Sequence, residues 1–314
     1  MSDLAIIGAG AWGSALAVLF ARNGKNVTLW ARDPAQAAAM AATRANPRLP
    51  GITLPLNLTI TSTMPDADIM LLAVPTQHVS ALALPPGPPL ILCCKGLESG
   101  SLRLPPELFP ARATAILTGP NFAHEVAALL PAAAVLATPD ATLRATLMAA
   151  LQTPSFRLYG SPDITGAALG GAAKNVIAIA AGVVIGAGLG ENARAALITR
   201  GIAEIARLAV ALGGRAETIS GLSGLGDLLL TCTGPSSRNF SLGLALGHGQ
   251  SLAAILATRS SVTEGIATAP ALLARAQAAG IDMPITQAVT SLLAGAQTVP
   301  ATVTALMTRA PRDE

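Results

Sequence analysis

The chain has 314 residues, a length that fits two domains of ordinary size. Its hydrophobic share of 52% and charged share of 12% exclude a disordered protein, because disorder requires low hydrophobicity and high charge. The formal net charge of +3, without any run of Lys or Arg, argues against a nucleic-acid partner and is compatible with a small anionic ligand.

The cysteines and histidines indicate a reducing compartment and no metal site. Cys93, Cys94 and Cys232 are odd in number and two are adjacent, so they form no disulfide framework. The three histidines are scattered, without metal-ligand spacing. The amino-terminal residues lack the basic region and cleavage site of a signal peptide. We therefore expect a cytoplasmic protein.

The first half of the chain predicts strands that alternate with helices. Alanine-rich segments at 11–23 and 34–43 predict helices, the first ended by Gly24. Short apolar runs, several bounded by glycine or proline, predict strands at 4–7, 26–30, 58–61, 69–74, 90–95, 114–117 and 132–137. This alternation indicates a doubly wound parallel sheet with helices on both faces.

After about Phe156 strand-like runs become rare and the chain predicts an all-helical region. Residues 176–190 are its most apolar stretch, but they are fewer than the ~20 residues of a membrane span. We expect a buried helix there and no membrane span. The predicted helices are 164–187, 193–211, 222–230, 241–247, 251–258, 266–279 and 285–294.

The turn after the first predicted strand reads Gly8-Ala9-Gly10-Ala11-Trp12-Gly13 and opens a predicted helix. Gly8 permits a tight turn, Gly10 lets the backbone approach a pyrophosphate, and Gly13 allows close packing of helix and strand. The helix N-terminus adds N–H groups and a positive dipole end. A glycine-rich turn without a ligand is the plainer alternative. The position favours an α/β protein with a Rossmann-like dinucleotide-binding domain over 1–158 and an all-helical substrate domain over 159–314.

The end of the second predicted strand indicates which cofactor binds. An acid there selects NAD through the ribose hydroxyl, and an arginine suits the 2′-phosphate of NADP. The chain has Arg32 directly after the strand and Asp33 one residue further. We predict NADP(H), with NAD(H) as the alternative; an ordinary exposed arginine is the plainer interpretation.

Polar residues also follow two later strands. Lys95 ends one of them, where ligands of open α/β sheets bind. Gly119-Pro120-Asn121 forms a turn after the next, and Asn121 can cap the helix that follows. A surface lysine and a plain turn are the alternatives. His124 alone is weak evidence for a general acid.

Lys174 stands at the head of the most apolar stretch, residues 176–190, where an unpaired charge is costly. A buried lysine there can protonate an oxygen that gains charge during hydride transfer. Asp227 and Thr231, four apart, share one helix face. Arg238 suits a phosphate through its planar guanidinium. A lysine that reaches solvent and a solvated loop arginine are the alternatives.

These segments, in this order from about residue 4 to residue 285, resemble the bacterial NAD(P)-dependent glycerol-3-phosphate dehydrogenases. The resembling segments are Gly8-Ala-Gly-Ala-Trp-Gly, Trp30-Ala-Arg-Asp, Ala73-Val-Pro-Thr-Gln, Cys94-Lys-Gly-Leu-Glu, Thr118-Gly-Pro-Asn-Phe-Ala-His-Glu-Val, Gly170-Gly-Ala-Ala-Lys-Asn-Val-Ile, Ala195-Ala-Leu-Ile-Thr-Arg-Gly, Gly221-Leu-Ser-Gly-Leu-Gly-Asp-Leu and Thr231-Cys-Thr-Gly-Pro-Ser-Ser-Arg-Asn. The family usually carries serine where Asn121 stands and often serine or threonine near Ala11.

The resemblance implies a role for each matching residue. It implies catalytic roles for Lys174 as proton donor and acceptor, Lys95, Asp227 and Thr231. It implies substrate contacts by Lys95, Gly119, Asn121, Lys174, Asp227, Ser237, Arg238 and Asn239. It implies cofactor contacts by Gly8, Gly10, Ala11, Trp12, Gly13, Arg32, Lys95, Ala123, Arg238, Val262 and Glu264.

The implied reaction is the reversible reduction of dihydroxyacetone phosphate to sn-glycerol 3-phosphate, which supplies glycerophospholipid synthesis. Lys174 delivers the proton, Lys95 stabilises the developing charge and Asp227 orients Lys174. The alternatives are another two-domain enzyme, such as a β-hydroxyacid or ketopantoate reductase, and a non-catalytic NADP(H)-binding module. We expect a homodimer that packs through the alanine-rich helices.

Overall fold

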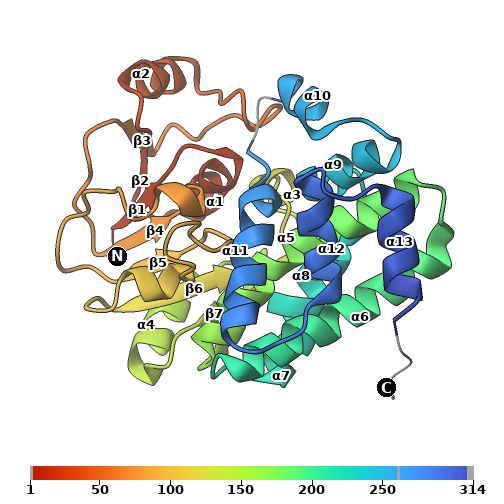
Figure 1. The fold of residues 1–314 in the computed structure, drawn as a ribbon. Helices are drawn as coiled ribbons and strands as arrows, with labels where there is room; N and C mark the ends of the chain where they lie inside the picture. The colour runs from red at the N-terminus through yellow and green to blue at the C-terminus, as the bar shows by residue number, and fades with distance from the viewer. Residues whose placement is uncertain (1–2, 260–261, 310–314) are drawn as a thin grey trace. The chain divides into compact units, whose positions relative to one another are not determined.

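The computed structural model describes residues 3–259 and 262–309 (Figure 1). They divide into two compact units. Unit 1 falls within Met1–Lys95 and Leu104–Ala168, and unit 2 falls within Gly96–Arg103 and Leu169–Glu314.

Unit 1 is built on an eight-stranded sheet in the order β3-β2-β1-β4-β5-β6-β7-β8. The order reverses between β1 and β4, and in open α/β sheets ligands bind beyond the carboxyl ends of the strands at such a point. The strands are β1 (Leu4–Ile7), β2 (Val27–Trp30), β3 (Leu58–Thr61), β4 (Ile69–Leu72), β5 (Leu90–Leu92), β6 (Thr114–Thr118), β7 (Ala132–Ala137) and β8 (Phe156–Ser161).

Helices cover this sheet and complete the core of unit 1. The core combines residues 15–21 of α1 with apolar residues of the strands. Asp33 and Asp140 cap α2 and α4 by accepting hydrogen bonds from backbone N–H groups of the first turn. The helices are α1 (Ala11–Arg22), α2 (Pro34–Thr43), α3 (Ala123–Ala127) and α4 (Ala141–Leu151), with short 3₁₀ turns η1 (Thr76–His78) and η2 (Pro105–Leu108).

The predicted α/β fold class and the seven predicted strands are confirmed, and the sheet is parallel except at one pair of strands. β6 and β7 pair antiparallel, while β7 and β8 are parallel to each other. The connection between β6 and β7 contains only the five-residue α3. Such a helix rises about 8 Å, too little to return the chain along a strand of about 20 Å.

β8 was not predicted as a strand. It lies at one edge of the sheet, where Phe156 and Leu158 are buried and alternate with the exposed Arg157 and Tyr159. The guanidinium of Arg157 lies 5.2 Å from the ring centroid of Tyr159. An alternating strand has fewer apolar residues than a strand buried on both faces, which explains why it was missed.

Unit 2 is helical, as predicted. Its helices are α5 (Ile164–Gly186), whose first residues belong to unit 1, α6 (Gly190–Ala211), α7 (Ala216–Ser220), the π-helical turn η3 (Leu222–Gly226), α8 (Asp227–Cys232), α9 (Arg238–Gly247), α10 (Leu252–Ala257), α11 (Glu264–Ala278), α12 (Pro284–Leu293) and α13 (Val299–Met307). The short α7 and the carboxy-terminal α13 were not predicted.

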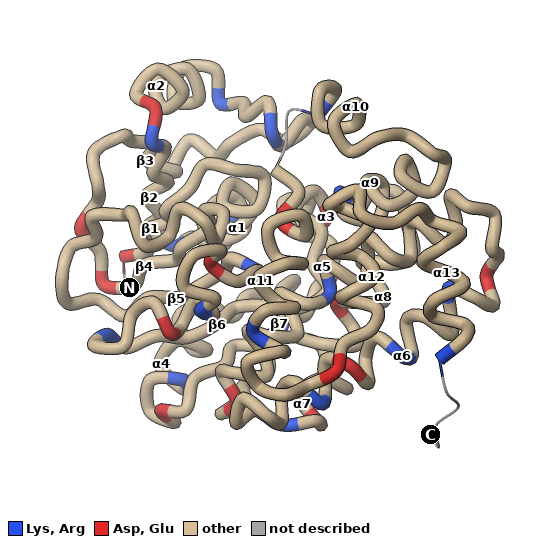
Figure 2. Tube along the Cα trace, in the orientation of Figure 1, with Lys and Arg blue, Asp and Glu red and all other residues tan. Residues whose placement is uncertain are grey.

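α5 is the core helix of unit 2. It has 23 residues and is apolar enough to cross a membrane by length and composition, so the expectation of a segment that is too short is wrong. The buried helix that the sequence predicts is confirmed, because 94% of the most apolar window of α5 lies inside the protein. Charged residues are sparse and dispersed along the described chain, without a long run of one sign (Figure 2).

Candidate active site

The turn between β1 and α1 is shaped by glycines. Gly8 has φ +119°, and a Cβ there would lie 2.8 Å from the carbonyl oxygen of Ala73. A Cβ on Gly13 would lie 1.9 Å from the carbonyl oxygen of Gly8, so only glycine lets the helix approach the turn this closely. Gly10 differs from both, since nothing lies within 4 Å of the Cβ position. Space for a ligand therefore remains beside the backbone of Gly10.

This turn fits the pyrophosphate of a dinucleotide. Gly10 is the N-cap of the twelve-residue α1, whose first-turn N–H groups and positive dipole end favour an anion. The first turn of α1 contains no acidic residue that would oppose it. The indole Nε1 of Trp12 is buried without a hydrogen-bond partner among the described residues. A bound cofactor would satisfy these donors.

The two charged residues after β2 have different surroundings. The Asp33 carboxylate accepts a hydrogen bond from the backbone N–H of Ala35 and caps α2. Arg32 is exposed. An exposed guanidinium at this end of β2 is chemically suited to the 2′-phosphate of NADP.

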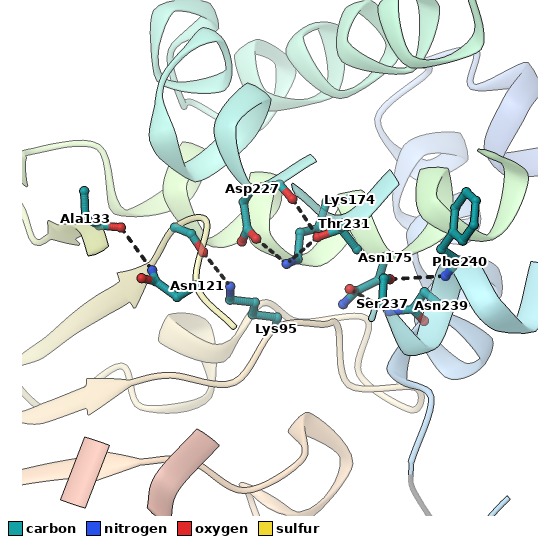
Figure 3. A network of polar contacts seen from close by, with 11 residues as sticks. Lys95, Asn121, Ala133, Lys174, Asn175, Asp227, Thr231, Ser237, Asn239 and Phe240 are labelled. Atoms are coloured by element: carbon teal, nitrogen blue, oxygen red, sulfur yellow. Dashed lines mark hydrogen bonds and ion pairs between the residues drawn. The ribbon is translucent and has the colours of Figure 1, made fainter. Parts of the chain in front are cut away.

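Lys95 and the turn after β6 meet in unit 1 (Figure 3). The Lys95 ammonium donates to the carbonyl oxygen of Gly119 at 3.2 Å. Gly119 has φ +148°, and a Cβ there would lie 3.0 Å from the Cα of Ala134, so the close approach to β7 requires glycine. The sequence-predicted Lys95, Gly119 and Asn121 therefore belong to one local cluster.

Asn121 does not cap α3, so that expectation is wrong. The N-cap of α3 is Phe122, without a side-chain hydrogen bond. The Asn121 amide instead donates to the carbonyl oxygen of Ala133 at 3.1 Å, and its Oδ1 is buried without a partner among the described residues. Ala123 begins α3, and His124 beside it is 62% exposed, 3.7 Å from the Glu125 carboxylate.

Lys174, Asp227 and Thr231 form a buried cluster in unit 2 (Figure 3). The Lys174 ammonium forms an ion pair with the Asp227 carboxylate and donates to the Thr231 hydroxyl at 3.0 Å. That hydroxyl donates to the Asp227 carbonyl oxygen at 2.6 Å, which fixes its orientation. Asp227 is fully buried, so its charge is balanced by Lys174 and not by water.

Ser237, Arg238 and Asn239 stand at the N-terminus of α9. The Ser237 hydroxyl caps this helix by accepting from the N–H of Phe240 at 3.2 Å. Arg238 is exposed and donates to the carbonyl oxygen of Val262 at 2.9 Å, two residues before Glu264, which begins α11. These residues combine a guanidinium with a helix N-terminus, the combination that binds phosphate.

Sequence reasoning missed Asn175, which ties α5 to α9. Its Oδ1 accepts from the Asn239 amide at 2.9 Å (Figure 3), and the Asn239 Oδ1 accepts from the N–H of Gly265 at 3.1 Å. Asn175 is 4% exposed. The available signal was a second polar residue beside Lys174 in an otherwise apolar helix, because buried polar groups need partners.

Glycines bring α9 against α5. A Cβ on Gly182 of α5 would lie 2.1 Å from the carbonyl oxygen of Phe240, and one on Gly243 of α9 would lie 1.9 Å from that of Ile179. The two backbones therefore touch, so Asn239 can reach Asn175.

The pKa values of two buried cysteines argue against a thiolate nucleophile, and the acidic side chains of the described residues form no metal site. Burial raises the pKa of the Cys232 thiol to about 12 even though Lys174 lowers it, and burial raises that of Cys93 as well. Both remain protonated thiols near neutral pH. No group of three or more His, Cys, Asp or Glu side chains within 3–259 and 262–309 could hold a metal ion.

Comparison with known proteins gives the family of this arrangement. Residues 3–144 match the family model described as "NAD-dependent glycerol-3-phosphate dehydrogenase N-terminus", and residues 163–304 match that of the C-terminus. The glycerol-3-phosphate dehydrogenase [NAD(P)+] of Acidiphilium cryptum is 61% identical over 99% of this chain and 98% of its own length. That of Gluconobacter oxydans is 53% identical over 92% of each chain.

A solved structure supports the same family as the two family models and the two relatives. The crystal structure of glycerol-3-phosphate dehydrogenase from Coxiella burnetii is 36% identical, with a TM-score of 0.93 over 98% of this chain and 99% of that one. The chain belongs to the NAD-dependent glycerol-3-phosphate dehydrogenase family.

Proposed function

We propose that this chain catalyses the reversible reduction of dihydroxyacetone phosphate to sn-glycerol 3-phosphate with NADPH or NADH, and so supplies glycerophospholipid synthesis. The observation that carries the proposal is the buried Lys174, held by Asp227 and Thr231. A buried, hydrogen-bonded ammonium is a proton donor for a carbonyl oxygen that is being reduced. Family membership supports dihydroxyacetone phosphate over ketopantoate as the substrate, and it supports an enzyme over a non-catalytic binding module.

The cofactor, when bound, supplies a hydride to the ketone carbon of the substrate. Lys174 donates a proton to the ketone oxygen as that oxygen gains negative charge, and takes it back in the reverse direction. Asp227 balances and orients the Lys174 ammonium, and Thr231 fixes it through a second hydrogen bond. Lys95 stabilises the developing negative charge.

The remaining proposed contacts come from residues of both units and are given for each unit in turn. In unit 1 the dinucleotide contacts are Gly8, Gly10, Ala11, Trp12, Gly13, Arg32, Lys95 and Ala123, and the substrate contacts are Lys95, Gly119 and Asn121. In unit 2 the substrate contacts are Lys174, Asp227, Ser237, Arg238 and Asn239, and the cofactor contacts are Arg238, Val262 and Glu264. The exposed Arg238 at a helix N-terminus supports a phosphate-bearing substrate. We propose residues 1–158 as the dinucleotide domain and 159–314 as the substrate domain.

We also propose a cytoplasmic homodimer. The three cysteines are buried and none forms a disulfide, which supports a reducing compartment. Light scattering of the purified chain tests the dimer, because a monomer would contradict it.

The decisive assay follows NADPH and NADH oxidation by ultraviolet absorbance with dihydroxyacetone phosphate and, in parallel, with ketopantoate. We expect turnover with the phosphorylated ketone and formation of sn-glycerol 3-phosphate. Turnover with ketopantoate alone would favour the other reductases. Cofactor binding without turnover of either substrate would favour a non-catalytic module.

A further inference from the structure

Asn46 lies beneath the glycine turn, in the loop after α2, and is only 2% exposed. Its Nδ2 donates to the carbonyl oxygen of Ala9 at 3.1 Å and to the Ser14 hydroxyl at 2.7 Å. Ala9 stands between Gly8 and Gly10, and Ser14 lies in the first turn of α1. One side chain from outside the motif therefore holds both the turn and the helix start.

The orientation of the Asn46 amide is fixed at its other end. The side-chain Oδ1 accepts from the backbone N–H of Arg48 at 3.0 Å. The backbone carbonyl oxygen of Asn46 accepts from the N–H of Leu49 at 2.9 Å. A side-chain amide has one acceptor oxygen and two N–H donors. With the oxygen turned to Arg48, the NH₂ group faces Ala9 and Ser14.

Holding the Ala9 carbonyl determines where the next N–H points. The Ala9–Gly10 peptide is trans, and in a trans peptide the C=O and the following N–H point in opposite directions. Drawing the Ala9 oxygen toward the buried Asn46 directs the Gly10 N–H away from the interior. A phosphate needs N–H groups facing it and is repelled by carbonyl oxygens. Gln36 supports the same oxygen from α2 at 3.5 Å.

We propose that Asn46 is a positioning residue for the cofactor: it sets the peptide between Ala9 and Gly10 so that the Gly10 N–H faces the pyrophosphate. The inference rests on the proposed function, because it assigns a role in dinucleotide binding. It adds a residue outside the Gly8–Gly13 motif, one that touches neither cofactor nor substrate.

The test compares Asn46→Ala with the wild type in steady-state kinetics. We expect the KM for NADPH to rise about tenfold, the effect of one lost hydrogen bond to a charged group. The kcat at saturating NADPH and the KM for dihydroxyacetone phosphate should stay within about twofold. Titration calorimetry with NADPH should show the same loss of affinity.

Asn57→Ala is the matched control. The Asn57 amide donates to the carbonyl oxygen of Ala21 at 2.9 Å, so it ties a loop to the other end of α1. We expect its KM for NADPH to be that of the wild type. Asn46→Leu, which keeps the approximate size of the side chain but has no N–H, should behave like Asn46→Ala and separates the hydrogen bonds from packing.

The outcomes distinguish this inference from the proposed function. A wild-type chain without dihydroxyacetone phosphate reductase activity contradicts the proposed function. An active wild type with an unchanged KM for NADPH in folded Asn46 variants overturns the inference. If neither Asn46 variant folds, Ser14→Ala decides, because it removes one partner of the amide; we expect a KM increase of about threefold, and no change overturns the inference.

Discussion

The glycine turn of unit 1 and the lysine cluster of unit 2 are built in opposite ways. The turn uses six consecutive residues and offers backbone N–H groups, with glycine where a side chain would collide. The cluster uses three side chains, and Lys174 is separated from Asp227 by 53 positions and from Thr231 by 57. The proposed binding of the pyrophosphate thus depends on backbone shape, whereas the proposed proton transfer depends on side-chain chemistry.

Because of this difference, we expect substitutions in the turn and in the cluster to have different effects. A substitution in the turn acts through added volume, which disturbs the fold where the new Cβ would collide with protein atoms, as at Gly13, and cofactor binding where the Cβ position is open, as at Gly10. A substitution in the cluster removes a functional group and can leave the backbone intact. The following substitutions test that distinction.

Removing the proton donor should have the largest effect. We expect Lys174→Ala to lower kcat by about 10²–10³ while the affinity for NADPH stays close to that of the wild type. The chain has three lysines, and Lys25, in the turn after α1, lies outside the predicted site. Lys25→Ala is therefore the control and should retain full turnover. Wild-type kcat in Lys174→Ala would refute the assigned role.

Adding one methyl group to the turn should come next. We expect Gly13→Ala to lower the free energy of unfolding by about 3 kcal/mol, because its Cβ would collide with the carbonyl oxygen of Gly8. Gly10→Ala meets no protein atom and should unfold like the wild type, yet bind NADPH less tightly. Urea unfolding and calorimetry measure the two effects. Equal stability of Gly13→Ala and Gly10→Ala would contradict the interpretation that the close backbone contact requires glycine at position 13 and not at position 10.

The smallest effect concerns Glu204, a buried carboxylate of unit 2 distant in sequence from its partners. It accepts from the N–H of Ile285 at 2.7 Å, at the start of α12. Burial raises the pKa of Glu204 to about 7, although hydrogen bonds from Ile285 and Thr286 oppose this. The folded protein therefore binds more protons than the unfolded chain between pH 4.5, the ordinary value, and about 7.

It follows that stability falls as the pH rises through this window, by about 2 kcal/mol. Glu204→Gln should flatten this slope, and Glu217→Gln, on the exposed surface of α7, should leave it unchanged. Urea unfolding between pH 4.5 and 7.5 measures the slope. A slope that is the same in Glu204→Gln and in the wild type would show that another group titrates.

The sequence predicts the parts of this molecule that are local. The α2 bounds of 34–43 and the β3 bounds of 58–61 agree with the structure, because proline, Asp33 and apolar runs mark them directly. The shared face of Asp227 and Thr231 also follows from their spacing. Their position beside Lys174 came only from the family resemblance, since helix spacing says nothing about a partner more than fifty positions away.

The features that the sequence did not predict also depend on contacts between residues that are not neighbours in the chain. Asn46 bonds to Ala9 across 37 positions from a loop without periodicity. The Asn121 side chain had a local partner available as a helix cap but bonds to Ala133 on the neighbouring strand. The antiparallel β6–β7 pair depends on how a short connection closes in space. Each is decided by tertiary packing, which outweighs local preference.

The contact between α5 and α9 has a mechanical consequence. Where Gly182 and Gly243 let the two main chains touch, no layer of rotatable side chains remains to absorb a displacement. α9 therefore rests directly on the core helix, and Arg238 and Asn239 stand in its first turn. We expect a phosphate bound there, as proposed above, to be held by a helix that is anchored on the buried core of unit 2.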